Sequence, residues 1–143
     1  MKILISACLL GVNCRYSARA AEALPEVRVL MEKHTLIPVC PEQLGGLTTP
    51  REPSEICAGR VISRDGCDNT SAFCRGAEET LRLAKLFGCK YAVLKERSPS
   101  CGSGAVYDGS FSKTLMVGDG VTAALLKKSG ITVLGESEIE KLL

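Results

Sequence analysis

Short apolar runs alternate with segments of helical periodicity along most of this chain, and no other feature constrains its fold as strongly. Four runs have the character of buried strands: residues 2–7, 35–39, 90–95 and 131–134. Strands that alternate with helices are joined by right-handed crossovers into a parallel sheet with helices on both faces. We therefore expect an α/β fold with a mainly parallel sheet in the strand order 2-1-3-4.

The segments between these strands carry helix and turn signals. Apolar residues at helical spacing predict a helix over residues 17–33, divided or kinked at Pro25. Start and stop signals predict three more helices: residues 69–87 with a cap at Asp68 or Asn69 and a stop at Gly88, residues 118–128 ended by Gly130, and a short final helix with a capping box at Ser137 and Glu140.

The remaining segments read as a hairpin and loops. A small hairpin is expected at residues 59–66 around Asp65-Gly66, and residues 105–116 have an undefined extended character. Residues 41–53 form a Pro- and Gly-containing irregular loop, and loops of this length usually carry function.

Length and charge bound the class of protein. A chain of 143 residues predicts one domain, residues 1–143, and a net charge of +2 without a basic stripe gives no indication of nucleic-acid binding. The eight cysteines include no C-x-x-C pair, and the chain is too rich in core residues for a disulfide-stapled scaffold. Reduced thiols and a cytoplasmic protein are expected.

The N-terminus is not expected to act as a membrane signal. Residues 4–8, LISAC, imitate a bacterial lipoprotein cleavage box. The apolar run before Cys8 is shorter than the about 7–15 residues of a secretory signal and far below a membrane-spanning length.

Three cysteines stand where predicted strands end. Cys8 follows the first strand, Cys40 ends the second, and Cys101 lies in the loop after the third. The carboxyl ends of parallel strands open onto one crevice, where α/β folds bind ligands, so the three thiols should meet there. Three thiolates indicate a metal or an iron–sulfur cluster, and three protein ligands leave a position free for chemistry.

Isolated cysteines are more commonly small buried apolar residues. That reading is credible for Cys8, whereas polar loop residues around Cys40 and Cys101 favour function. Cys14 shares a loop with Cys8, and its role stays open between a spare ligand, a resolving thiol and none. The other cysteines are expected to be structural: Cys57, Cys67, Cys74 and Cys89.

Polar groups suited to proton transfer lie near these thiols. Glu42, two residues after Cys40, would give or take a proton near neutral pH if partly buried, and Ser98 would hold a substrate or relay a proton. The sole histidine, His34, lies at the end of the first predicted helix, which argues against a Ser-His-Asp hydrolase. Basic groups near the strand ends can offset thiolate charge: Arg15, Arg51, Lys95 and Arg97.

Four segments follow one another along the chain: SACLLGVNCRYS at 6–17, CPEQLGGLTTPREPSE at 40–55, KERSPSCGSG at 95–104 and GDGVTAALL at 118–126. Together they resemble a bacterial family formerly known as domain of unknown function 523, which includes the [4Fe-4S]-dependent thiouracil desulfidases, and the resemblance covers nearly the whole chain. The resemblance implies a Rossmann-like three-layer domain. It also implies a [4Fe-4S] cluster held by Cys8, Cys40 and Cys101, with Glu42 and Ser98 at the catalytic positions.

The activity implied by the resemblance is removal of sulfur from a thiolated pyrimidine of the 2- or 4-thiouracil type. The substrate sulfur would bind the open iron, and the products would be the oxo-pyrimidine and sulfide, without net electron transfer. Two alternatives remain: a non-enzymatic metal- or cluster-binding redox sensor, and a structural α/β domain. The expected partner is this small molecule, with no nucleic acid or membrane, and pairing into a homodimer is open.

Overall fold

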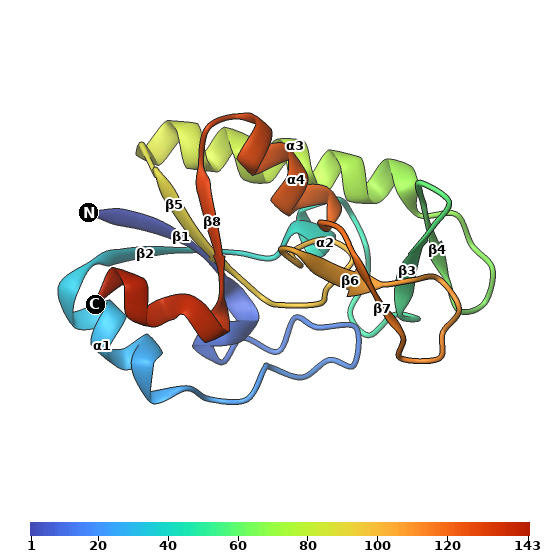
Figure 1. The fold of residues 1–143 in the computed structure, drawn as a ribbon, viewed down its shortest axis with the longest axis horizontal. Helices are drawn as coiled ribbons and strands as arrows, with labels where there is room; N and C mark the ends of the chain where they lie inside the picture. Colours follow the sequence, from blue (N-terminus) through green and yellow to red (C-terminus); the bar gives the residue numbers. More distant parts are fainter.

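The computed structural model describes all 143 residues, and its centre is a four-stranded parallel sheet (Figure 1). The strands are β1 (Lys2–Ser6), β2 (Thr35–Val39), β5 (Tyr91–Leu94) and β8 (Thr132–Gly135). Their order is β2-β1-β5-β8, and every neighbouring pair is parallel. This is the predicted order 2-1-3-4, so the α/β fold expected from the sequence is confirmed.

Helices cover both faces of the sheet, which gives three layers (Figure 1). The helical elements are α1 (Pro25–Lys33), α2 (Pro41–Leu44), α3 (Thr70–Phe87), α4 (Val121–Lys128) and the 3-10 helices η1 (Ala7–Leu10) and η2 (Glu136–Leu142). Alternate residues of β1 divide the core between the layers, because successive strand side chains point to opposite faces.

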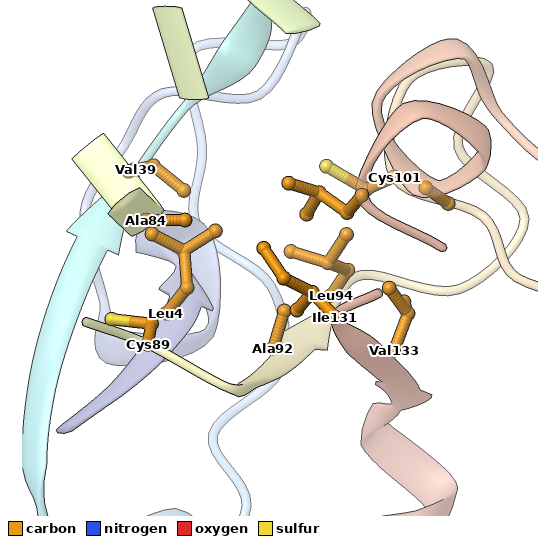
Figure 2. Packing of buried hydrophobic residues seen from close by; sticks show 11 residues of the cluster. Leu4, Val39, Ala84, Cys89, Ala92, Leu94, Cys101, Ile131 and Val133 are labelled. Carbon is orange, nitrogen blue, oxygen red and sulfur yellow. The ribbon is translucent and has the colours of Figure 1, made fainter. Parts of the chain in front are cut away.

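Each face of the sheet has its own apolar cluster. Leu4 packs with residues of α3 and α4, including Ala84 and Leu126, and Cys101 belongs to this cluster (Figure 2). Ile3 and Ile5 pack on the other face with Leu30 of α1 and with η2. All residues of β1 and β5 except the first of each strand are buried, which explains why the two sequences read as continuous apolar runs rather than alternating ones.

The helix predicted over residues 17–33 is wrong in its first half, since α1 begins only at Pro25. Proline fits the first helical position because it lacks the N–H that would be unsatisfied there. Residues 17–24 form a loop instead. Ala18 has a left-handed φ of 60°, and the Ala21 N–H donates to the Cys8 carbonyl, so this segment is tied to the loop after β1.

Two antiparallel hairpins lie beside the sheet (Figure 1). They are β3 (Ser54–Cys57) with β4 (Arg60–Ser63), and β6 (Ala105–Tyr107) with β7 (Leu115–Val117). The β3–β4 hairpin turns at Ala58-Gly59, where both residues have positive φ, as a two-residue hairpin turn requires. The chain also turns at Asp65-Gly66, as predicted: Ile62 forms an antiparallel bridge with Asp68, and the Ser63 N–H donates to the Cys67 carbonyl at 2.8 Å.

The end of the chain is a 3-10 helix, and its capping differs from the predicted box. The Glu138 carboxylate accepts a hydrogen bond from the Gly135 N–H at 3.3 Å. Ser137 instead donates through its N–H to Glu96 at 2.9 Å, which ties η2 to the loop after β5. The predicted stops of α3 at Gly88 and of α4 near Gly130 are confirmed. No helix has the length and apolar character needed to cross a bilayer.

Candidate active site

A cavity of about 310 Å³ opens at the carboxyl ends of β1, β2 and β5. Its wall includes all five residues that the sequence placed in a site: Cys8, Cys40, Cys101, Glu42 and Ser98. The loops after neighbouring parallel strands supply these side chains, as expected for the crevice of an α/β sheet.

Each of the three thiols lies in the segment that follows its strand. Cys8 lies in η1 and is 6% exposed, and Cys101 lies in the turn after β5 and is 5% exposed. Cys40 is the residue immediately before α2 and is half-buried. All eight cysteines are free, so no disulfide occupies these thiols.

Burial controls the ionisation of Cys101. Desolvation raises the pKa of its thiol to about 12, while hydrogen bonding with the Ser6 hydroxyl lowers the pKa by a smaller amount. Ser6 also accepts a hydrogen bond from the Lys95 N–H at 2.9 Å, so its hydroxyl joins the ends of β1 and β5. Ser100, which also lowers the pKa of Cys101, is fully buried against Thr122 of α4.

The thiols of Cys40 and Cys14 are hydrogen-bonded to each other. Hydrogen bonding with Cys14, followed by burial, raises the pKa of Cys40, and the Gln43 N–H opposes the rise. For Cys14, hydrogen bonding with Cys40 lowers the pKa, but hydrogen bonding with Cys8 and burial outweigh it and the pKa is raised. Cys14 therefore lies between the thiols of Cys8 and Cys40.

The chemistry of the donors suits an iron–sulfur cluster. No three His, Cys, Asp or Glu side chains are placed to hold a single metal ion. Hydrogen bonding with Cys14 and burial raise the pKa of Cys40, and burial raises that of Cys101, whereas a bound metal centre stabilises the thiolate outright. Soft thiolate ligands are those that iron–sulfur clusters select.

Glu42 forms an ion pair with an arginine. The Arg51 Nε donates to the Glu42 Oε1 at 3.0 Å, and the two side chains are 8% and 18% exposed respectively. Arg51 also donates through Nη2 to the Cys14 carbonyl at 3.0 Å and through Nη1 to Thr48 and Thr49. These contacts fix the position of the Glu42 carboxylate in the cavity wall.

Ser98 is oriented by the backbone of its own loop. Its hydroxyl oxygen accepts hydrogen bonds from the N–H groups of Ser100 and Cys101, both at 3.1 Å. A serine hydroxyl has two acceptor lone pairs and one donor hydrogen. The two amides use the acceptor capacity, so the hydroxyl has only its hydrogen left to offer to a molecule in the cavity.

The turn that carries Cys101 is packed directly against the start of α4. A Cβ added to Gly120 would lie 2.5 Å from the Ser100 carbonyl carbon and 2.9 Å from the Cys101 nitrogen. Only glycine permits this approach, and the N–H groups of Val121 and Thr122 then bond to the carbonyls of Pro99 and Ser100. The GDG segment thereby fixes where the Cys101 thiol stands.

Several residues of the cavity were not predicted from sequence. Ser6, Cys14 and Tyr16 belong to a segment that carries the family resemblance, whereas no sequence signal indicates Tyr107 or Phe111. The assignment of four cysteines as structural holds for Cys89, which is buried, and is wrong for three that are exposed: Cys57, Cys67 and Cys74.

The basic residues expected near the strand ends divide into paired and unpaired groups. Arg15, Lys95 and Arg97 line the cavity with Arg51. Lys95 is paired with Glu136 at 2.8 Å, while Arg15 and Arg97 have no carboxylate within 4.0 Å. His34 contacts the chain ends, the Met1 amine and the Leu142 carbonyl, and is absent from the cavity wall.

Known proteins that resemble this chain identify its family. Residues 3–138 match the sequence profile of a family described as 2-thiouracil desulfurase. The chain belongs to this family. The 2-thiouracil desulfurase family is a family of enzymes, so the expectation of an enzyme rather than a structural domain is confirmed.

Two known proteins are similar to this chain over nearly its whole length. An uncharacterized protein, YbbK, of Bacillus subtilis (strain 168) is 42% identical over 151 residues, which cover 99% of each chain. A solved structure of the [4Fe-4S]-dependent thiouracil desulfidase TudS has a TM-score of 0.93 and 42% identity, covering 99% of this chain and 94% of that one. The resemblance stated from the four sequence segments is confirmed.

Proposed function

We propose that this protein is a [4Fe-4S]-dependent desulfidase that hydrolyses the carbon–sulfur bond of a thiolated pyrimidine. The observation that carries the proposal is that Cys8, Cys40, Cys101, Glu42 and Ser98 line one cavity. The three cysteines would hold the cluster. When bound, it supplies an iron without a protein ligand, a Lewis acid with affinity for the soft sulfur of a thiocarbonyl.

Glu42 is the proposed general base. As a carboxylate paired with Arg51, it takes a proton from water while the oxygen of that water attacks the carbon of the thiocarbonyl. The carbon–oxygen bond forms, the carbon–sulfur bond breaks, and sulfur leaves as sulfide with the protons of the water. Thiopyrimidine and water give oxo-pyrimidine and hydrogen sulfide, so the reaction needs no oxidant or reductant.

Ser98 is the proposed donor to the heterocycle. Because its oxygen already accepts from the N–H groups of Ser100 and Cys101, its hydroxyl hydrogen is directed outward as a donor. A ring nitrogen or carbonyl oxygen of a pyrimidine would accept this hydrogen bond. The same two amides join Ser98 to the Cys101 turn, so the donor and a cluster ligand keep a fixed relative position.

The charge at the cavity favours a substrate that carries negative charge. Four basic side chains of the wall have no carboxylate partner: Arg15, Arg64, Arg97 and Lys113. The acidic residues of the wall are otherwise engaged, since Glu42 binds Arg51, Glu55 accepts from backbone N–H groups, and Glu96 accepts from Ser137. A thiolated pyrimidine nucleotide is therefore expected to have a lower KM than the free base.

The test is anaerobic reconstitution followed by assay of sulfide release from 2-thiouracil, 4-thiouracil and their nucleosides and nucleotides. Four iron atoms per chain with sulfide release are expected. The variant Glu42→Gln should keep the visible absorption of the cluster and lose turnover, and Ser98→Ala should keep the absorption and turn over more slowly. Zinc or no metal, with no sulfide release, would return the three cysteines to a regulatory or structural role.

A further inference from the structure

The loop that joins β6 to β7, residues 108–114, forms one wall of the cavity. A buried carboxylate accepts hydrogen bonds from the backbone of this loop. Glu55 of β3 is 9% exposed and has no cation partner. Its Oε1 accepts two backbone hydrogen bonds from this loop, from Gly109 N–H at 3.0 Å and Phe111 N–H at 3.1 Å. A carboxylate can be buried in this way because charge-assisted hydrogen bonds to amides replace its hydration.

The backbone of the loop adopts a conformation that its residues do not favour alone. Phe111 and Lys113 have φ of 56° and 61°, in the left-handed region that bulky residues rarely enter. Such conformations persist only where surrounding contacts enforce them, and they concentrate at functional sites. The side chains of the same two residues line the cavity.

A second contact seats the loop on the first hairpin. A Cβ on Gly109 would lie 2.8 Å from the Ile56 carbonyl oxygen and 3.0 Å from the Cys57 Sγ, and the φ of Gly109 is 94°. Both the close approach and the positive φ therefore require glycine at this position. The loop closes at its base through the Asp108 N–H and the Thr114 carbonyl at 2.9 Å. Figure 1 shows the two hairpins side by side.

We propose that Phe111 is a specificity-determining residue that contacts the pyrimidine ring, and that Glu55 is the positioning residue that holds it there. The Arg64 guanidinium lies 6.0 Å from the centroid of the Phe111 ring, so a cation supports the aromatic side chain from the opposite hairpin. Pyrimidine rings are bound in proteins by stacking on aromatic side chains. This inference rests on the proposed function and adds to it the residue that recognises the ring.

The test compares four variants of the reconstituted enzyme. Phe111→Ala should raise the KM for a thiolated pyrimidine about tenfold, or ~1.4 kcal/mol of binding, with kcat within about twofold. Glu55→Leu, which removes the acceptor, should raise KM equally and speed hydrogen exchange of the 109 and 111 amides. Glu55→Gln retains an acceptor oxygen and should stay close to the parent in both readouts.

The double variant Glu55→Leu/Phe111→Ala separates positioning from general damage. If Glu55 acts through Phe111, the double variant has the KM of Glu55→Leu alone; if the two effects multiply, the positioning role is refuted. A KM for Phe111→Ala within twofold of the parent refutes ring contact. Lack of sulfide release by the parent itself is a different outcome, which overturns the proposed function and this inference with it.

Discussion

Replacing Arg51 by leucine should damage both stability and turnover, because this one side chain joins three segments around the cavity. Its guanidinium binds the Glu42 carboxylate of α2, the Cys14 carbonyl of the loop after β1, and Thr48 and Thr49 of its own loop. Its backbone N–H also donates to the Tyr16 carbonyl.

The size of the effect follows from what the substitution leaves without a partner. A hydrogen bond to a charged group contributes about 1.5–3 kcal/mol, and breaking a fully buried ion pair costs about 3–5 kcal/mol. The Glu42 side chain is 18% exposed, so water rehydrates it in part. We expect Arg51→Leu to lower the free energy of unfolding by ~2–3 kcal/mol, which moves the urea midpoint by about 1–2 M.

Turnover should fall further than stability alone explains. A general base displaced by about 1 Å can lose about 10²-fold in rate, and Arg51 is the only cation paired with Glu42. Arg51→Lys keeps the charge but lacks the planar fork that reaches both Glu42 and the Cys14 carbonyl, so its kcat should lie between those of Arg51→Leu and the parent.

Urea unfolding monitored by circular dichroism, iron content and kcat of each variant test this reasoning together. Arg82→Leu is the matched control, because Arg82 is 75% exposed in a helix-surface pair with Glu79 and should change stability by less than about 0.5 kcal/mol. If Arg51→Leu unfolds at the parent's urea concentration with the parent's kcat, the linking role of Arg51 is wrong.

Three other outcomes follow from the structure. Cys101→Ser should lose iron and turnover together, whereas Cys14→Ser, which removes no proposed ligand, should keep four irons per chain; equal iron loss in both would contradict the ligand set. Gly120→Ala should unfold at lower urea and bind less iron than the parent, because the added carbon meets the Cys101 turn; an unchanged urea midpoint would show that the turn yields. Burial raises the pKa of Asp119, but hydrogen bonds from Lys127 and the Gly104 N–H outweigh it and the pKa is lowered. Asp119→Asn should therefore cost up to about 1 kcal/mol at neutral pH, a difference that disappears as the pH falls below the unfolded value of ~3.9; a difference that persists at pH 2 would exclude this ion pair as its source.

The convergence of Cys8, Cys40 and Cys101 was predictable because it depends on topology rather than on detail. Each cysteine follows a strand that is apolar enough to recognise, and parallel strands place their carboxyl ends together. Glu42 and Ser98 were predictable as neighbours of two of these cysteines. The hydrogen bonds that orient them were not predictable. The Ser98 hydroxyl accepts from two N–H groups only because of the path that the backbone of its loop follows.

Other parts of the structure depend on contacts distant in sequence, which local patterns do not report. The helical spacing in residues 17–24 is overridden because the Ala21 N–H binds the Cys8 carbonyl instead of a helical partner. The pairing of Arg51 with Glu42 spans an irregular loop, and the hold of Glu55 on Phe111 joins two separate hairpins. The sequence alone does not tell which residue pairs with Glu42 or with Glu55, because both pairings depend on the path of the folded backbone.

The three thiols follow three separate strands, so no short piece of the chain carries more than one of them. If they hold the cluster as proposed, the unfolded chain has no counterpart of the site, and the bound cluster stabilises only the assembled sheet. Protein without iron would lack this stabilisation and would unfold at a lower urea concentration than the reconstituted protein.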